Sequence, residues 1–205
     1  MITIEQARQY YEGADAVHDF DHVLRVLALA ERLALEEGAD LEIVRVAALL
    51  HDVARGQGDR IVADHAHAGA EFTRSLLEGE DPEWVEAVAH AVAAHRFRAG
   101  PSPRTVEAKV LHDADKLDAI GAIGVARAFA YGGHEGQRLW AKVQPGYEET
   151  QSNRHQHTPV HEYHYKLKEI KGRLLTESAR RLAEGRHAFM VAYFERLDLE
   201  VRGLA

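Results

Sequence analysis

The 205-residue chain contains no cysteine. This absence excludes disulfide scaffolds, cysteine-ligated zinc, iron–sulfur clusters and thiol nucleophiles. It is typical of a reducing compartment, and we expect a cytoplasmic protein. A chain of this length buries about 70% of its unfolded surface, so it needs neither a disulfide nor a metal merely to fold.

Long apolar runs and an excess of positive charge are also lacking. No uninterrupted apolar run reaches the roughly 18 residues of a membrane span, and the N-terminal residues carry no apolar segment of a signal peptide. Lys and Arg number 25 against 33 Asp and Glu, for a formal net charge of −8. Since proteins that bind nucleic acid over a wide surface are usually basic, we expect neither a nucleic-acid nor a membrane partner. A homo-oligomer is compatible with the composition.

Proline is scarce as well, with five in the chain. Most of the sequence repeats apolar residues at the i, i+3, i+4 spacing of helices, and no strand-like alternation flanked by turn residues competes. The pattern predicts an all-α fold, a helical bundle with C-terminal helices packed on its core, in one domain over residues 1–205. The expected helices cover about residues 3–12, 20–37, 40–51, 61–77, 81–95, 104–119, 121–131, 160–182 and 184–200.

A stretch from Gly132 to about Pro159 differs from the rest because it holds several glycines and few aliphatic residues. A long loop in a compact domain is often a lid or a binding loop, so we predict that this one is mobile. Four histidines follow at its end, at positions 155, 157, 161 and 164. A second metal site there is the less favoured reading. His161 and His164, one helical turn apart, are better candidates for substrate contact when the loop closes.

Histidine is abundant, with 14 in the chain. The densest polar constellation consists of His18, His22, His51, Asp52 and Asp115. A carboxylate beside the apolar helix face before His51 is costly to bury unless it is paired, and a divalent ion resolves that cost. Imidazoles and carboxylates together suit a hard or borderline divalent ion. Taken singly, each histidine is more often a hydrogen-bonded core residue, and Asp115 with Lys116 fits a solvated face, so spacing alone does not decide.

Longer strings around these residues carry a resemblance. Residues 18–26 (HDFDHVLRV), 48–52 (ALLHD) and 113–124 (DADKLDAIGAIG) look like the YedJ/YpgQ-type bacterial branch of the HD-domain metal-dependent phosphohydrolase superfamily. The strings 164–167 (HYKL) and 186–190 (RHAFM) look like the same branch. The resemblance covers nearly the whole chain and fades in the loop at 132–159. An isolated His-Asp pair is weak evidence, whereas this ordered set is specific.

The resemblance implies an HD-domain helical bundle with one divalent ion. Manganese is the expected ion, with magnesium, cobalt, nickel or iron as alternatives. By position, the metal ligands are His22, His51, Asp52 and Asp115. Four residues have expected catalytic roles. Asp52 orients or deprotonates water, and His65 and His95 contact phosphate or assist the leaving group. Lys116 places a positive charge on phosphate. The substrate-binding residues are His18, Arg25, Lys116, Arg127, His161 and His164. In two-metal HD proteins, the positions of His65 and His95 ligate a second ion.

The implied reaction is hydrolysis of a nucleotide. The branch favours a (deoxy)nucleoside triphosphate, cleaved to monophosphate and pyrophosphate, and the nearest rival is a 5′-monophosphatase. The string 96–100 (RFRAG) lacks the Gly-Tyr-Pro extension of HD-type cyclic-di-GMP phosphodiesterases, which argues against that activity. A non-catalytic helical module that binds nucleotide or metal is the alternative of a different class. The complete ligand set disfavours it.

Overall fold

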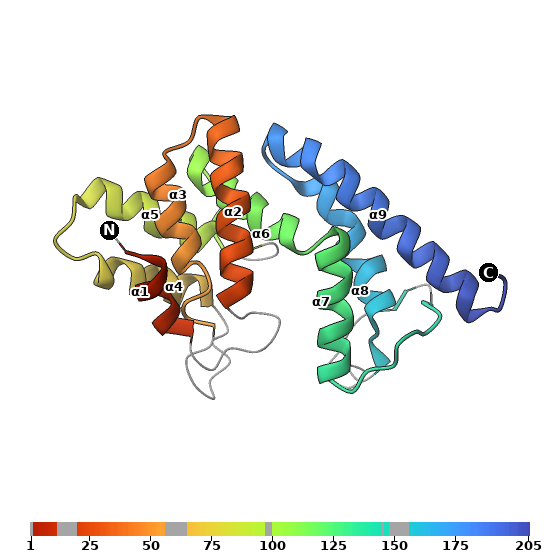
Figure 1. The fold of residues 1–205 in the computed structure, drawn as a ribbon. Helices are drawn as coiled ribbons and strands as arrows, with labels where there is room; N and C mark the ends of the chain where they lie inside the picture. The colour runs from red at the N-terminus through yellow and green to blue at the C-terminus, as the bar shows by residue number, and fades with distance from the viewer. Residues whose placement is uncertain (1, 12–19, 56–64, 97–99, 145, 148–155) are drawn as a thin grey trace. The chain divides into compact units, whose positions relative to one another are not determined.

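The computed structural model describes residues 2–11, 20–55, 65–96, 100–144, 146–147 and 156–205. Within these ranges all regular structure is helical and no strand occurs (Figure 1), which confirms the all-α class. The chain groups into two compact units. The first comprises Met1–Lys116 with Leu175–Ala179, and the second comprises Leu117–Leu174 with Arg180–Ala205. A single domain over the whole chain stays a prediction.

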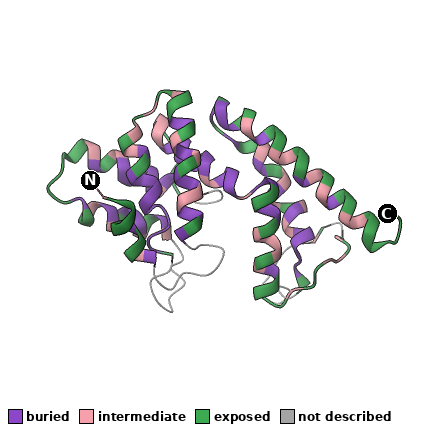
Figure 2. Ribbon diagram, viewed as in Figure 1, coloured by how far each residue is buried: buried purple, intermediate pink, exposed green. Residues whose placement is uncertain are grey.

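The first unit is built from the helices before residue 117. They are α1 (Ile4–Arg8), the 3₁₀ turn η1 (Gln9–Tyr11), α2 (Phe20–Glu37), α3 (Leu41–Leu50), α4 (His65–Leu76), α5 (Pro82–Ala94) and α6 (Val106–Asp118), whose last two residues belong to the second unit. α3 contacts α1, α2 and α5, and α5 contacts α4. Every residue from Val46 to Leu50 is buried, and Figure 2 shows the buried face continuing along α2 and α5.

Capping residues place the ends of α3 and α5. The carboxylate of Asp40 accepts hydrogen bonds from the backbone N–H groups of Glu42 and Ile43, and Asp81 accepts one from Trp84 with Pro82 at the first helical position. Such caps satisfy N–H groups that have no partner inside the helix. His51 and His95 are the C-cap residues of α3 and α5. Each helix therefore ends on an imidazole.

A glycine lets α4 approach these two helix ends closely. A Cβ atom added at Gly69 would lie 3.3 Å from Cγ1 of Val92 and 3.6 Å from the carbonyl oxygen of His51. A larger residue at position 69 would therefore crowd the side chain of Val92. Since His65 opens α4 one turn before Gly69, this contact also sets where its imidazole lies.

The helices of the second unit pack through aromatic rings. They are α7 (Gly121–His134), α8 (Pro159–Tyr165), the 3₁₀ segment η3 (Leu167–Arg173) and α9 (Glu177–Val201), which belongs to this unit from Arg180 onward. Phe194 of α9 stacks on Tyr163 of α8, with ring centroids 4.2 Å apart, and on Phe129 of α7. Gly121 starts α7 with a φ of 78°, a conformation that favours glycine. α7 runs to His134, three residues into the predicted loop.

The predicted division of the C-terminal helices was wrong. A break was expected between 182 and 184, but α9 runs through it, and Gly185 lies inside the helix. The chain instead breaks between η3 and α9, where carboxylates from distant helices bind the backbone. Asp113 of α6 accepts hydrogen bonds from the backbone N–H groups of Leu175 and Thr176, at 2.9 and 2.7 Å, and Glu37 accepts one from Ser178 at 2.7 Å. None of the described helices is long and apolar enough to cross a membrane.

Candidate metal centre

Backbone carbonyls determine which ring nitrogen carries the proton in His51 and His95, the two imidazoles at the helix ends. Nδ1 of His51 lies 2.8 Å from the carbonyl oxygen of Ala48, and Nδ1 of His95 lies 2.6 Å from that of Val92. Because a carbonyl oxygen only accepts, each Nδ1 carries the proton. In the neutral ring, Nε2 then holds a lone pair and points into the centre. A histidine held this way is oriented as a metal ligand usually is.

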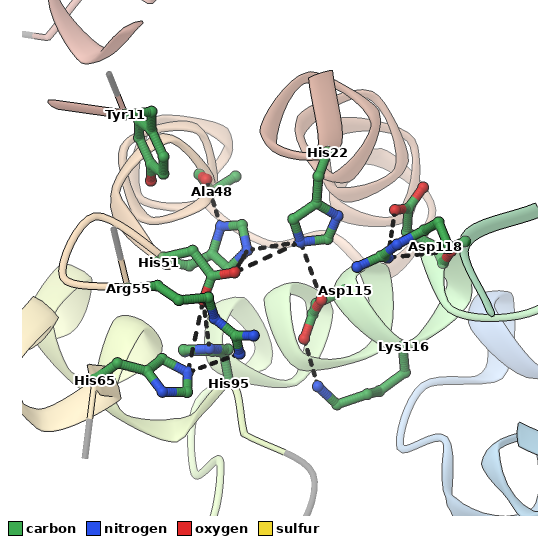
Figure 3. Close-up of polar contacts among 12 residues, drawn as sticks. Tyr11, His22, Ala48, His51, Arg55, His65, His95, Asp115, Lys116 and Asp118 are labelled. Carbon is green, nitrogen blue, oxygen red and sulfur yellow. Dashed lines mark hydrogen bonds and ion pairs between the residues drawn. The ribbon is translucent and has the colours of Figure 1, made fainter. Parts of the chain in front are cut away.

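Four side chains from three regions of the first unit meet at these lone pairs (Figure 3). Nε2 of His22, in the first turn of α2, lies 3.3 Å from Nε2 of His51 and 3.5 Å from Oδ1 of Asp115 on α6. Oδ2 of Asp52 lies 3.8 Å from Nε2 of His22 and 3.7 Å from Nε2 of His51. The structure thus brings together all four predicted ligands.

A second group adjoins the first through the same aspartate. Oδ1 of Asp52 lies 3.6 Å from Nε2 of His65, the first residue of α4, and 3.5 Å from Nε2 of His95. His22, His51 and Asp52 form one set of ligand atoms close enough to hold an ion, and Asp52, His65 and His95 form another. Asp52 therefore faces imidazoles with both of its oxygens.

Burial and neighbouring charges set the protonation of the centre. Burial lowers the pKa of His51 to about 4, against the opposing attraction of Asp52. Burial and the adjacent Arg55 lower the pKa of His65 to about 4. Burial alone would raise the pKa of Asp52, but His51, His95 and Arg55 lower it well below its ordinary value. His51 and His65 are consequently neutral near neutral pH, and Asp52 is ionised.

Asp115 is held in the same ionised state. Burial would raise the pKa of this carboxyl, but Lys116, His22 and His51 lower it well below its ordinary value. Nζ of Lys116 donates to Oδ2 of Asp115, which leaves Oδ1 facing His22. The two oxygens of Asp115 thus serve different partners.

These donors fit a divalent cation. The Nε2 lone pair of His51 faces Oδ2 of the ionised Asp52, so an acceptor faces an acceptor in a buried space. Such an arrangement is unfavourable unless a positive charge lies between the acceptors. Imidazole nitrogens and carboxylate oxygens are ligands for manganese, iron, cobalt, nickel and zinc. The His/Asp cluster is thus suited to hold a divalent metal, whose identity the geometry leaves open.

The predicted substrate-binding residues are spread over the chain. Arg25 lies on α2 one turn after His22 and is half-buried, whereas His18 lies outside the described residues. In the second unit, Nη1 of Arg127 donates to Oδ2 of Asp118 at 2.8 Å. His161 is buried beside Tyr147, and His164 borders a cavity of about 820 Å³ lined also by Trp140 and Phe194. Their roles toward a substrate stay predictions.

Sequence reasoning missed Arg55 and Tyr11. Nε of Arg55 donates to Oδ1 of Asp52 at 3.2 Å, and Nη2 donates to Nε2 of His65 at 3.0 Å. The i, i+3 spacing from Asp52 was the available signal. The hydroxyl of Tyr11 donates to the carbonyl oxygen of Leu49 at 2.9 Å, and burial, with Asp52 nearby, raises the pKa of this phenol well above its usual value. No comparable spacing marked Tyr11 in the sequence.

Comparisons with known proteins agree with this geometry. Residues 19–120 match the HD domain family. Bacillus subtilis YpgQ is 34% identical over 193 residues, which cover 91% of this chain and 86% of YpgQ. The crystal structure of YpgQ in complex with ADP superposes with a TM-score of 0.74 at 31% identity, over 99% of this chain and 100% of that one.

A second solved structure, described as an HD-superfamily hydrolase from Bacillus thuringiensis, superposes with a TM-score of 0.71 at 29% identity. That match covers 97% of this chain and 94% of the other. The matched segment of the family contains His22, His51, Asp52 and Asp115. With these similarities and the His/Asp centre in the first unit, the chain belongs to the HD-domain family and is a hydrolase of the HD superfamily.

Proposed function

We propose that this hydrolase acts on nucleotides and cleaves a (deoxy)nucleoside triphosphate to the monophosphate and pyrophosphate. The observation that carries the proposal is the convergence of His22, His51, Asp52 and Asp115 beside the charged amine of Lys116. Crystallisation of the relative YpgQ with ADP favours a nucleotide over other phosphate esters. The net charge of −8 does not oppose this choice, because a small anion responds to the local field of its site.

One divalent ion, with manganese expected first, completes the proposed site. His22, His51, Asp52 and Asp115 would hold it. A divalent ion supplies Lewis acidity toward a phosphoryl oxygen and lowers the pKa of a coordinated water.

The chain's own residues then bind the substrate and orient the reacting groups. Asp52 stays ionised because its pKa is held low, so its carboxylate accepts a hydrogen bond from the attacking water and aligns it with phosphorus. Lys116 carries a positive charge beside Asp115 and suits a phosphate oxygen as a point charge. Nε2 of His65 accepts from Arg55, so in the neutral ring Nδ1–H is the group left to donate to phosphate.

A product-resolved assay tests the proposal. The purified protein is incubated with a panel of ribo- and deoxyribonucleoside mono-, di- and triphosphates, each with Mn²⁺, Mg²⁺, Co²⁺, Ni²⁺ or Fe²⁺. Phosphorus NMR then identifies the products. We expect monophosphate and pyrophosphate from triphosphates, and competitive inhibition by ADP. Asp52→Asn is the inactive comparison. Asp21→Asn is its matched control, since this exposed aspartate lies one residue before His22.

Each other product pattern selects an alternative. Orthophosphate from monophosphates alone indicates a 5′-monophosphatase, and a diphosphate with orthophosphate places the cleavage at the terminal phosphate. Binding of nucleotide and metal with no turnover across the panel identifies the non-catalytic module. Any of these three results overturns the proposed reaction.

A further inference from the structure

The centre has two places where a positive charge is stabilised, one at each oxygen of Asp52. Oδ2 faces His22 and His51, and Oδ1 faces His65 and His95, all at 3.5 to 3.8 Å. The side chain of Asp52 is 3% exposed, so solvent contributes little to stabilising its charge. A buried carboxylate in such a setting is retained only with compensating partners on both sides.

On the Oδ1 side, the chain itself supplies a cation. The guanidinium of Arg55 donates from Nε to Oδ1 of Asp52 and from Nη2 to Nε2 of His65 (Figure 3). A local turn brings it there, because the backbone N–H of Arg55 donates to the carbonyl oxygen of Asp52 at 2.9 Å. Two of the three ligand atoms of the second His/Asp group are therefore bonded to a positive charge of the chain.

We infer that Arg55 supplies the second cation of this centre and limits it to one divalent ion per chain. A guanidinium keeps its charge at every working pH and only donates hydrogen bonds. A divalent ion at Asp52, His65 and His95 would have to break both bonds of Arg55 and would meet a like charge held beside its ligands. On the Oδ2 side, the lone pair of His51 faces the carboxylate, and a divalent ion is the cation that fits between them.

This inference deepens the proposed function and rests on it, because it assumes the divalent ion proposed at His22, His51, Asp52 and Asp115. It also gives Arg55 a position next to the substrate. Its side chain is 36% exposed, so the guanidinium can contact a phosphate oxygen while it stays bonded to Asp52. In that arrangement, the guanidinium of Arg55 balances phosphate charge as a second metal ion would.

Metal counting tests the inference. The wild-type chain, Arg55→Gln and Arg55→Lys are dialysed against excess Mn²⁺, and bound manganese is measured by elemental analysis. We expect one ion in the wild-type chain, two in Arg55→Gln and one in Arg55→Lys, whose ammonium still repels an entering ion. Electron paramagnetic resonance adds a second readout, because two manganese ions on one carboxylate give a coupled spectrum that a single ion does not.

Two further variants localise the effect. The double variant Arg55→Gln/His65→Ala should return to one ion, because the gained site loses a ligand. Arg74→Gln is the matched control: Arg74 is also 36% exposed and bridges two carboxylates, Glu71 and Glu86, on the outside of α4. We expect it to bind one ion.

One ion in Arg55→Gln, or two in the wild-type chain, overturns the inference while leaving the proposed reaction intact. The wild-type count needs no substitution, so a variant that fails to fold does not block the test. Conversely, the expected counts without nucleotide turnover support the role of Arg55 and refute the proposed function.

Discussion

Two histidine clusters in this chain have similar ring spacings but different chemistry. In the first unit, ring centroids of His22, His51, His95 and His65 follow one another in this order at 5.2 to 5.6 Å, and their Nε2 atoms face carboxylate oxygens. In the second unit, His157 and His161 lie 5.5 Å apart, and Tyr147 packs against both rings. The spacing of imidazoles therefore does not distinguish the clusters.

Their hydrogen-bond partners do distinguish them. Nδ1 of His161 lies 2.8 Å from the hydroxyl of Thr158, and Nδ1 of His157 lies 3.3 Å from that of Tyr147. A hydroxyl both donates and accepts, so it satisfies the Nδ1 atom of an imidazole without a metal. The carboxylate of Glu162, 3.5 Å from His157, is also bonded to Lys166 and thus neutralised within the chain. A divalent ion is needed where a lone pair faces a carboxylate oxygen with no cation of the chain between them, and His51 with Oδ2 of Asp52 has that arrangement in the first cluster.

Removing one histidine from each cluster should give the largest contrast. His51→Ala deletes a ligand whose lone pair faces Asp52, so we expect loss of bound metal and at least about a 100-fold loss of turnover, more than an outer-shell substitution typically costs. His161→Ala should keep one metal ion and lose less turnover than His51→Ala, because His161 is a predicted substrate contact and not a metal ligand. Elemental analysis and initial rates measure both, with circular dichroism to verify helical content.

Asp52→Ala extends the same test to the shared carboxylate and should also release the metal. Full metal stoichiometry in either His51→Ala or Asp52→Ala would show that the ligand assignment is wrong. Loss of metal in His161→Ala would remove the distinction between the clusters.

The fold was predictable where its signals are local. Asp40 and the Asp81-Pro82 pair mark helix starts through contacts within four residues, and α3 and α5 begin where those caps predict. The start of α9 was not predictable, because the backbone N–H groups of Thr176 and Ser178 are bonded to Asp113 and Glu37, more than 60 positions away. A single sequence carries no periodic signal for such a contact.

The metal centre was likewise predictable only in part. The four predicted ligands came from a resemblance in ordered strings rather than from spacing, since they lie on elements far apart in the chain. What the strings do not contain is the sharing of Asp52 between two groups, which depends on α4 approaching α3 and α5 at Gly69. Arg55 was missed because its role follows from that sharing.

Removing the charge next to Asp115 should have a smaller effect than removing a ligand. Lys116→Met leaves His22, His51 and Asp52 in place, so we expect one bound ion but a roughly 10-fold lower kcat/KM, within the range of outer-shell substitutions. Lys171→Met is the matched control, because Lys171 also forms an ion pair, with Glu184, in the second unit. Metal content and substrate titrations separate the outcomes. Release of the ion from Lys116→Met would make Lys116 a support of the metal site instead of a substrate contact.

In the second cluster, substitution of His161 should lower the stability of the fold without releasing the metal. His161 is buried, is hydrogen-bonded to Thr158 and packs against Tyr147 with ring centroids 4.3 Å apart. Its truncation leaves a cavity and an unpaired hydroxyl, which together cost about 1–3 kcal/mol. Urea unfolding of His161→Ala and of Thr158→Val measures this cost. Equal stability of wild type and His161→Ala would mean that the stack contributes nothing to folding.

The smallest expected effect concerns the acid stability of Glu162. Burial would raise the pKa of this carboxyl, but the nearby His157, 3.5 Å away, and the charge of Lys166 lower it to about 2, below its ordinary 4.5. A depressed folded-state pKa means that the carboxylate stabilises the fold above about pH 4.5 and that this contribution is lost as the pH falls toward 2. Wild type should therefore lose more thermal stability than Glu162→Gln between pH 5 and pH 3. Glu86→Gln is the control, because Glu86 forms an ion pair with Arg74 at the surface. Salt at 0.5 M should screen this surface ion pair but leave the interactions of the more buried Glu162 largely unchanged. If the thermal stabilities of wild type and Glu162→Gln fall in parallel with pH, the ionisation of Glu162 does not contribute to the stability of the fold.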